Sequence, residues 1–174
     1  MERYLWLFPL VLVLHELEEI IGLGIWIQKN QLLMNHRFKR IQKQFLNYTT
    51  EGYALASAEL LVISILISAG AYHFKWYYLW CGCFIGFTFH LVVHIIQVFV
   101  IRKYIPAVIT ADILIPASVL IIKKSVYIVQ YSKLDLLIWS GIGFLFLVIN
   151  LFIQRFIMKK FSKYLRNIKI DNTP

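Results

Sequence analysis

Long apolar runs separated by short polar segments dominate the chain. Such runs cover about residues 4–27, 53–72, 76–101, 104–122 and 134–154. Each is close to the roughly 20 residues that a helix needs to cross a hydrocarbon core about 30 Å thick. Backbone groups in lipid must be hydrogen-bonded within the protein, and these continuous runs do not alternate as barrel strands do. The pattern therefore predicts an all-α, polytopic membrane helix bundle with about five transmembrane helices.

Two further segments combine apolar residues at helical spacing with basic residues on the remaining faces. They are the loop at about 28–48 and the C-terminal tail at about 156–169. Basic amphipathic helices of this kind lie in the plane of the membrane surface. We expect both segments to be interfacial helices, so that residues 1–174 form a single membrane domain.

The basic residues are unevenly divided between the two sides that five spans would create. The 28–50 loop, the 102–104 turn and the chain after residue 154 hold most of them. Cytoplasmic segments of membrane proteins carry an excess of Lys and Arg. The expected orientation in the cell membrane therefore has the N-terminus outside and the C-terminus in the cytoplasm.

The formal net charge of +9 points to an acidic partner. Each basic residue near an anionic bilayer contributes about 1 kcal/mol of attraction, so anionic membrane lipids are the expected partners. The charge is split between two amphipathic segments and no nucleic-acid motif is present, which argues against nucleic acid. Whether the chain forms a homo-oligomer is left open.

Ionisable residues inside the apolar runs are the main exception to the hydrophobic pattern. In the first run His15, Glu18 and Glu19 share one helix face, and in the third run His90 and His94 are one turn apart. A charged residue at a helix centre costs about 2.5–3.5 kcal/mol when it faces lipid. We therefore expect these side chains to face one another.

Acidic residues in two other runs extend this set. Glu59 in the second run and Asp112 in the fourth lie at a similar depth, roughly 10–18 Å from the cytoplasmic helix ends at about 1.5 Å per residue. Imidazoles and carboxylates in one layer are suitable ligands for zinc or iron, so a divalent transition metal is the expected cofactor. The expected ligands are His15, Glu18, Glu19, His90, His94 and Asp112.

The same set supplies candidates for catalysis. A buried glutamate not bound to the metal would act as general base, and Glu18, Glu19 and Glu59 are the candidates. The site would open toward the inner leaflet beneath basic residues, so a lipid-like substrate with an anionic head is expected. Arg102 and Tyr104, at the cytoplasmic mouth, would bind that head.

Two short motifs resemble a known family. The segment His15-Glu-Leu-Glu-Glu19 resembles the motif that names the HXXEE-domain family of small integral membrane proteins, and His94 suits the further histidine of that family. Residues 104–107, Tyr-Ile-Pro-Ala, resemble its Y-x-P-G element, with Ala107 in place of glycine. If that glycine has a positive φ, the local backbone is expected to differ here. The family has no established activity, so the resemblance implies a membrane protein without naming a reaction.

Three functions are compatible with these residues. The first is a metal-dependent membrane enzyme, with hydrolysis of an amphiphile or di-iron oxidation as its chemistry. The second is a proton- or ion-coupled transporter, because Pro106 and Pro116 bracket Asp112 and broken helices are common at transport sites. The third is a structural subunit in which the polar set only fixes helix pairing.

Overall fold

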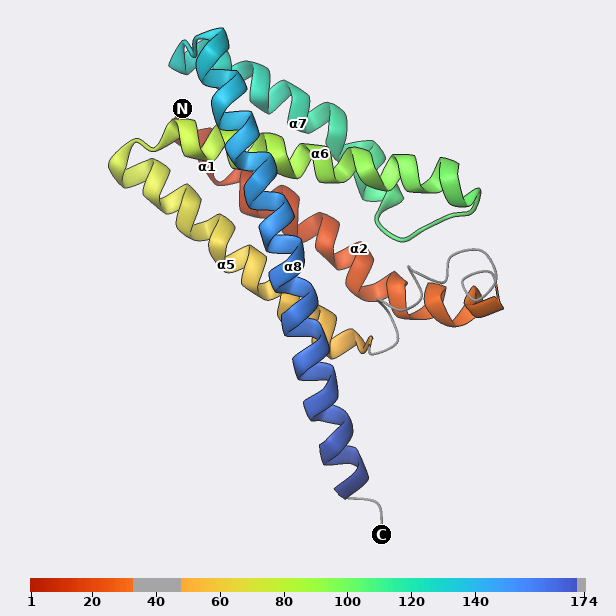
Figure 1. The fold of residues 1–174 in the computed structure, drawn as a ribbon. Helices are drawn as coiled ribbons and strands as arrows, with labels where there is room; N and C mark the ends of the chain where they lie inside the picture. The colour runs from red at the N-terminus through yellow and green to blue at the C-terminus, as the bar shows by residue number, and fades with distance from the viewer. Residues whose placement is uncertain (33–47, 172–174) are drawn as a thin grey trace.

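A computed structural model describes residues 1–32 and 48–171, with side chains described as far as residue 168. Within these residues all regular structure is helical and no strand is present, which confirms the all-α prediction. Figure 1 shows the arrangement of the helices. They are α1 (Glu2–Leu5), α2 (Leu7–Lys29), α5 (Thr50–Phe74), α6 (Tyr77–Ile101), α7 (Val108–Val129) and α8 (Lys133–Asp171).

Three of the helices in the described part of the chain are long and apolar enough to cross a membrane. They are α5, α6 and the part of α8 that ends at Ile168. Helices α2 and α7 are of similar length, but α2 carries three glutamates and α7 carries Asp112 and two lysines. The prediction of about five spans is thus supported for three helices, and the ionisable residues of α2 and α7 set those two apart.

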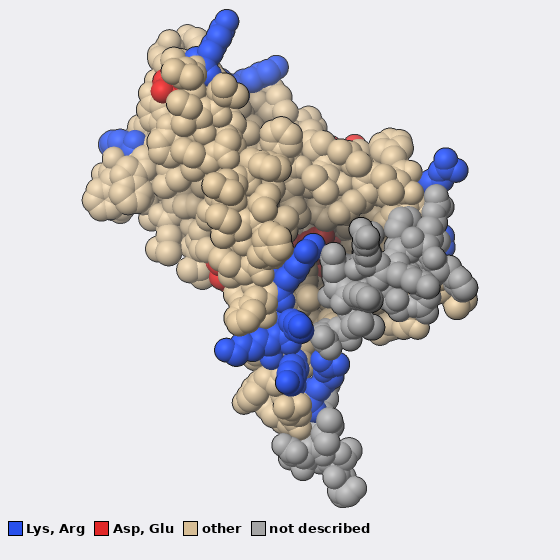
Figure 2. Space-filling model, viewed as in Figure 1, with Lys and Arg blue, Asp and Glu red and all other residues tan. Residues whose placement is uncertain are grey.

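Helix α8 packs across the others rather than alongside one neighbour. It contacts α6 and α5, while α7 packs on α6 and α2 packs on α5. In Figure 1 the C-terminal half of α8 extends beyond the remaining helices. Figure 2 shows Lys and Arg side chains gathered on this half, with residues other than Lys, Arg, Asp and Glu over most of the visible bundle.

The last apolar run and the basic tail form one uninterrupted helix of 39 residues. The prediction that residues 156–169 form a helix separate from the span at 134–154 was therefore wrong, while their position at the membrane surface stays a prediction. No glycine or proline occurs after Gly143 in this helix, so nothing in the sequence ends it. Met158 and Ser162 are buried against the start of α5, where Ser162 Oγ lies 2.9 Å from Thr49 Oγ1. The other predicted interfacial segment, 28–48, lies almost wholly outside the described residues.

The break between α1 and α2 follows from Pro9. Proline has no backbone N–H, so the carbonyl four residues earlier, that of Leu5, loses its helical donor. Ser68 Oγ of α5 and Trp80 Nε1 of α6 donate to this carbonyl at 2.9 and 3.0 Å. The N-terminus is thereby attached to two other helices.

An aromatic cluster joins the first half of α2 to α6. The ring of Phe8 lies 5.4–6.3 Å, centroid to centroid, from the rings of Trp80, Phe84 and Phe87. Two turns further along α2, the ring of His15 packs edge-on against Phe87 at 5.8 Å. The histidine is thus positioned where the aromatic core ends.

Glycines allow α6 and α8 to cross in backbone contact. A Cβ placed on Gly143 would lie 1.8 Å from the carbonyl oxygen of Gly82, and one on Gly86 would lie 2.5 Å from that of Gly143. Residues spaced by four drift about 40° around a helix at each step. The glycines of α6 therefore face α8, while His90 and His94, further along, face α2.

We predict that Gly143→Ala destabilises the protein by about 2 kcal/mol or more, because the new methyl group overlaps the backbone of α6. Thermal unfolding in detergent measures the change. Gly141→Ala is the matched control, since nothing lies within 4 Å of its Cβ position. Equal melting temperatures for the two variants would contradict the close crossing.

Candidate metal centre

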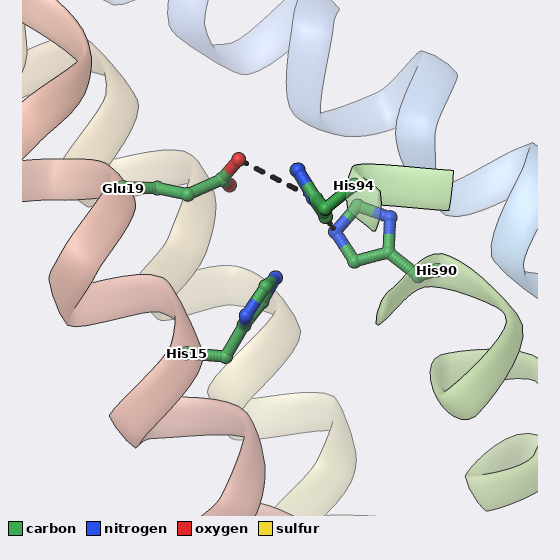
Figure 3. Close-up of side chains that lie close together, drawn as sticks. All are labelled: His15, Glu19, His90 and His94. Atoms are coloured by element: carbon green, nitrogen blue, oxygen red, sulfur yellow. Dashed lines mark hydrogen bonds and ion pairs between the residues drawn. The ribbon is translucent and has the colours of Figure 1, made fainter. Parts of the chain in front are cut away.

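Two imidazoles of α6 meet an imidazole and a carboxylate of α2 (Figure 3). One potential ligand atom from each of His15, Glu19, His90 and His94 lies within 4.8 Å of the others. His94 Nε2 is 3.0 Å from His90 Nε2 and 3.4 Å from Glu19 Oε1. Ligand atoms about 2.0–2.1 Å from a tetrahedral metal are about 3.3 Å apart. Two of the distances in the cluster are therefore close to those around a single metal ion, and the other ligand atoms lie within 4.8 Å.

Hydrogen bonds outside the cluster determine which nitrogen of His15 can bind a metal. His15 Nδ1 lies 3.0 Å from Thr110 Oγ1, which lies 2.7 Å from Glu18 Oε2. A carboxylate can only accept, so the Thr110 hydroxyl donates to Glu18 and offers a lone pair to His15. We therefore assign the proton of His15 to Nδ1, which leaves the lone pair of Nε2 available to the cluster.

That lone pair has no protein partner. His15 is fully buried, and its Nε2 has no hydrogen bond among the residues described. The ring centroids of His90 and His94 lie 5.4 and 4.9 Å from that of His15. A buried polar atom without a partner costs about 1–3 kcal/mol. Coordination of a metal ion would remove that cost, so the residues present fit such an ion.

Glu19 also has an outer partner. Its Oε1 faces His94, and its Oε2 accepts a hydrogen bond from the hydroxyl of Tyr53 on α5. One turn after Tyr53 on α5, the hydroxyl of Ser57 donates to the buried Glu16 at 2.5 Å. Outer hydrogen bonds of this kind fix the orientation of metal-binding side chains. The α5 helix thus holds the carboxylates of Glu16 and Glu19 in place.

A cavity of about 390 Å³ adjoins the cluster. Glu19, His90 and His94 form part of its wall, whereas the fully buried His15 does not. The volume falls within the roughly 300–1,000 Å³ range typical of small-molecule sites. A ligand in this cavity could therefore reach the cluster.

Glu18 points to the N-terminus of α7 and not into the cluster. Its carboxylate accepts from the backbone N–H groups of Ile109 and Thr110 at 3.3 and 2.7 Å, and from the Tyr104 hydroxyl at 2.9 Å. The first N–H groups of a helix lack helical partners, and the helix dipole favours an anion there. The structure therefore places this predicted ligand and catalytic candidate as a cap on α7.

Ala107 occupies the left-handed conformation expected of the family glycine. Its φ and ψ are 82° and −11°, and Val108 N donates to Ile105 O at 3.3 Å. With Pro106 before it, this is a type II turn, whose third position normally needs glycine. The expectation of a different backbone was wrong, because the turn persists with alanine. Pro106 also packs on Gly22 of α2, where a Cβ would lie 2.9 Å away.

The remaining predicted site residues lie outside the cluster. Glu59 accepts from Asn150 Nδ2 of α8 at 3.2 and 3.3 Å. Asp112 is exposed, because it is two residues, about 200° of helix rotation, from Thr110. Arg102 is exposed at the end of α6. The ionisable side chains of four helices were expected to meet because they lie at a similar depth. In the structure the cluster is formed by side chains of α2 and α6.

Tyr104 has a defined role at the entry to α7. Its hydroxyl donates to Glu18, and its carbonyl accepts from Trp26 Nε1 at 2.5 Å. Partial burial and the hydrogen bond to the carboxylate raise the pKa of Tyr104 to about 12. The phenol is therefore neutral near pH 7 and acts as a donor.

Thr110 and Tyr53, the outer partners, were missed in the sequence. A hydroxyl in an apolar helix carries no signal of its own, because most such groups bond to their own backbone. Only the tertiary contacts between α2, α5 and α7 identify these two residues.

The fold and the cluster define a helical protein with three candidate membrane spans and a buried His/Glu group. A family model described as "Protein of unknown function with HXXEE motif" matches residues 6–121, about two thirds of the chain. The chain belongs to the HXXEE family, as its motifs indicated. The match includes all four cluster residues and the 104–107 turn, while α8 lies beyond it. No curated protein and no solved structure matches the chain.

We predict that Thr110→Val weakens metal binding about 10- to 100-fold, because His15 loses the acceptor that orients it. Competition with a chromogenic zinc chelator measures the affinity. Thr110→Ser keeps the hydroxyl and should bind within a few-fold of the unsubstituted protein. A valine variant with unchanged affinity would show that the hydroxyl does not position His15.

We predict that Ala107→Gly stabilises the protein by about 1 kcal/mol, since alanine is strained in the left-handed region. This corresponds to roughly 2–4 °C in melting temperature for a chain of this size. Ala111→Gly, inside α7, should instead lower the melting temperature, because glycine weakens a helix interior. The same sign for both substitutions would contradict the assigned turn.

Proposed function

We propose that the chain is a zinc-dependent membrane hydrolase that acts on an amphiphilic substrate at the cytoplasmic leaflet. The observation that carries the proposal is the buried, unpaired Nε2 of His15, facing two further imidazoles beside a cavity. Three nitrogen donors from two helices suit a zinc ion with one position left open. Zinc is preferred to iron here because hydrolysis requires no change of oxidation state.

The residues have separate roles in this proposal. His15, His90 and His94 hold the ion, and Thr110 and Glu18 orient His15. A bound zinc ion would polarise the ester carbonyl and lower the pKa of water. Glu19, on the cavity wall and oriented by Tyr53, takes a proton from the attacking water as general base.

The overall reaction adds water across an ester bond. The hydroxyl of water goes to the acyl carbon, and its proton goes to the oxygen of the departing alcohol. The cavity supports an amphiphile as substrate, because most residues on its wall are apolar while Glu19, His90 and His94 lie at one part of it. An apolar chain can thus be bound while the ester faces the cluster.

The distribution of charge supports the assignment to the cytoplasmic leaflet. The basic half of α8 is the most strongly charged region visible in Figure 2. Under the positive-inside rule this half lies at the cytoplasmic face, with the N-terminus outside. The cavity, which includes Arg155 and Met158 of α8, would then lie near that face.

Transport is the second function that the sequence allows. It was supported by the expectation that the fourth apolar run forms a helix broken around Asp112, and α7 is not broken there. Helix α7 runs without interruption from Val108 to Val129 through Pro116, and Pro106 lies in the turn before it. Asp112 is exposed and separate from the histidines. A broken helix around an acidic site therefore does not occur here, and hydrolysis is the function that the geometry supports best.

We predict that protein purified without chelator contains about one zinc per chain, and that Glu19→Gln retains the zinc but hydrolyses medium-chain p-nitrophenyl esters at least 100-fold more slowly. His90→Ala should lose both zinc and activity, because it removes a ligand. Elemental analysis and release of p-nitrophenol in nanodiscs provide the two measurements.

Glu59→Gln is the matched control, since Glu59 pairs with Asn150 away from the cluster. It should retain zinc and hydrolysis. Absence of zinc from carefully handled protein would favour a structural role for the polar cluster. Retained zinc with full activity in Glu19→Gln would reject Glu19 as the base.

A further inference from the structure

We propose that the α8 wall of the cavity, at Arg155, binds the anionic head of a single-chain amphiphile. The inference names the substrate class of the proposed hydrolase and in that respect rests on the proposed function. Binding itself does not require catalysis, so the two can be tested separately. The anionic head is a carboxylate or a phosphate group, both of which present negatively charged oxygens to the guanidinium.

Arg155 is the one cationic side chain on the wall among the described residues. No carboxylate in the described part of the chain forms an ion pair with it, since the ion pairs there are Lys75–Glu2 and His94–Glu19. An unpaired guanidinium presents five N–H donors in a plane that matches carboxylate or phosphate oxygens. The charge therefore favours an anion at this end of the cavity.

Two neutral polar side chains lie on the same cavity wall as Arg155. Gln154 precedes Arg155 on α8, and Gln97 of α6 lies on the same cavity wall. Amide groups can donate hydrogen bonds to further oxygens of an anionic head. The polar part of the wall is therefore not limited to the cluster.

The remaining wall is suited to an apolar chain. Leu23, Ala56, Ile101 and Leu151 come from four different helices. Along α6 the wall runs from the polar His90 and His94 past Gln97 to Ile101, about 16 Å at 1.5 Å per residue. A cavity that combines apolar side chains from four helices with one unpaired cation fits an anionic amphiphile better than a fully polar solute.

The residues expected from the sequence to bind the head do not line this cavity. The hydroxyl of Tyr104 is engaged by Glu18 and its carbonyl by Trp26. Arg102 and Arg155 are both exposed, but only Arg155 is among the residues of the wall. Arg155 replaces them because α8, distant in sequence, packs on both α5 and α6 and so reaches the cavity.

The test uses the full chain in nanodiscs of zwitterionic lipid, above pH 8. The probes are 12-doxyl-stearate, which is anionic, and its methyl ester, which is neutral and otherwise identical. A doxyl group quenches tryptophan fluorescence at short range, so a probe bound in the cavity should quench Trp26, which lies on the wall, and Trp26→Phe identifies the contribution of this residue to the signal. We expect the anionic probe to bind at least tenfold more tightly than the ester.

The variants separate the cavity from the general surface charge. Arg155→Gln should abolish the preference, and Arg155→Lys should retain part of it because the charge remains. Lys159→Gln is the matched control, since Lys159 is exposed one turn further along α8 and does not line the cavity. It should change the preference less than twofold.

Three results would overturn the inference. They are equal binding of the acid and its ester, an unchanged preference in Arg155→Gln, and an equal loss in Lys159→Gln. Displacement of the probe by millimolar inorganic phosphate would reject an amphiphile in favour of a free anion, whereas no displacement supports the amphiphile.

Zinc content, measured on the same samples, separates the two proposals. Zinc present without an anion preference would reject the substrate class and leave the metal centre supported. An anion preference without zinc would reject the hydrolase and leave the anion site supported.

Discussion

The carboxylate of Glu18 at the start of α7 is the contact on which the arrangement of the cluster depends. It receives two backbone N–H groups of α7 and the hydroxyl of Tyr104, and so holds the turn at 104–107 against α2. The same carboxylate receives the Thr110 hydroxyl and thereby determines the free nitrogen of His15. One interaction between an acid and a helix end thus fixes both the helix packing and the orientation of an imidazole.

The H-x-x-E-E spacing gives the acids of α2 different tasks. Glu18 and Glu19 are adjacent, so their side chains are about 100° apart around the helix. Glu18 reaches α7, whereas Glu19 faces His94 of α6 and Tyr53 of α5. The family motif therefore combines a helix cap with two members of the cluster. Glu18 was expected to be a metal ligand. It is not part of the cluster, because the first N–H groups of α7 lack helical partners and also require an acceptor.

Several features of the fold could be predicted because they depend on local sequence. Apolar runs of spanning length form helices, and His90 and His94, four residues apart, share a face of α6. The depth of a residue along its helix does not show the direction in which its side chain points. Glu59 and Asp112 were therefore wrongly expected to meet the histidines. Helix rotation about the axis depends on contacts such as that of Gly143 with Gly82, which involve residues far apart in sequence.

The sequence by itself determined the helices, the membrane-like composition, the family and the residue types of the cluster. These properties follow from hydrophobicity, backbone hydrogen bonding and short motifs, all of which act locally. Only the tertiary structure decided that Glu18 caps α7, that Thr110 orients His15 and that Arg155 borders the cavity. Each of these depends on the rotation and crossing of whole helices, which packing between distant segments sets.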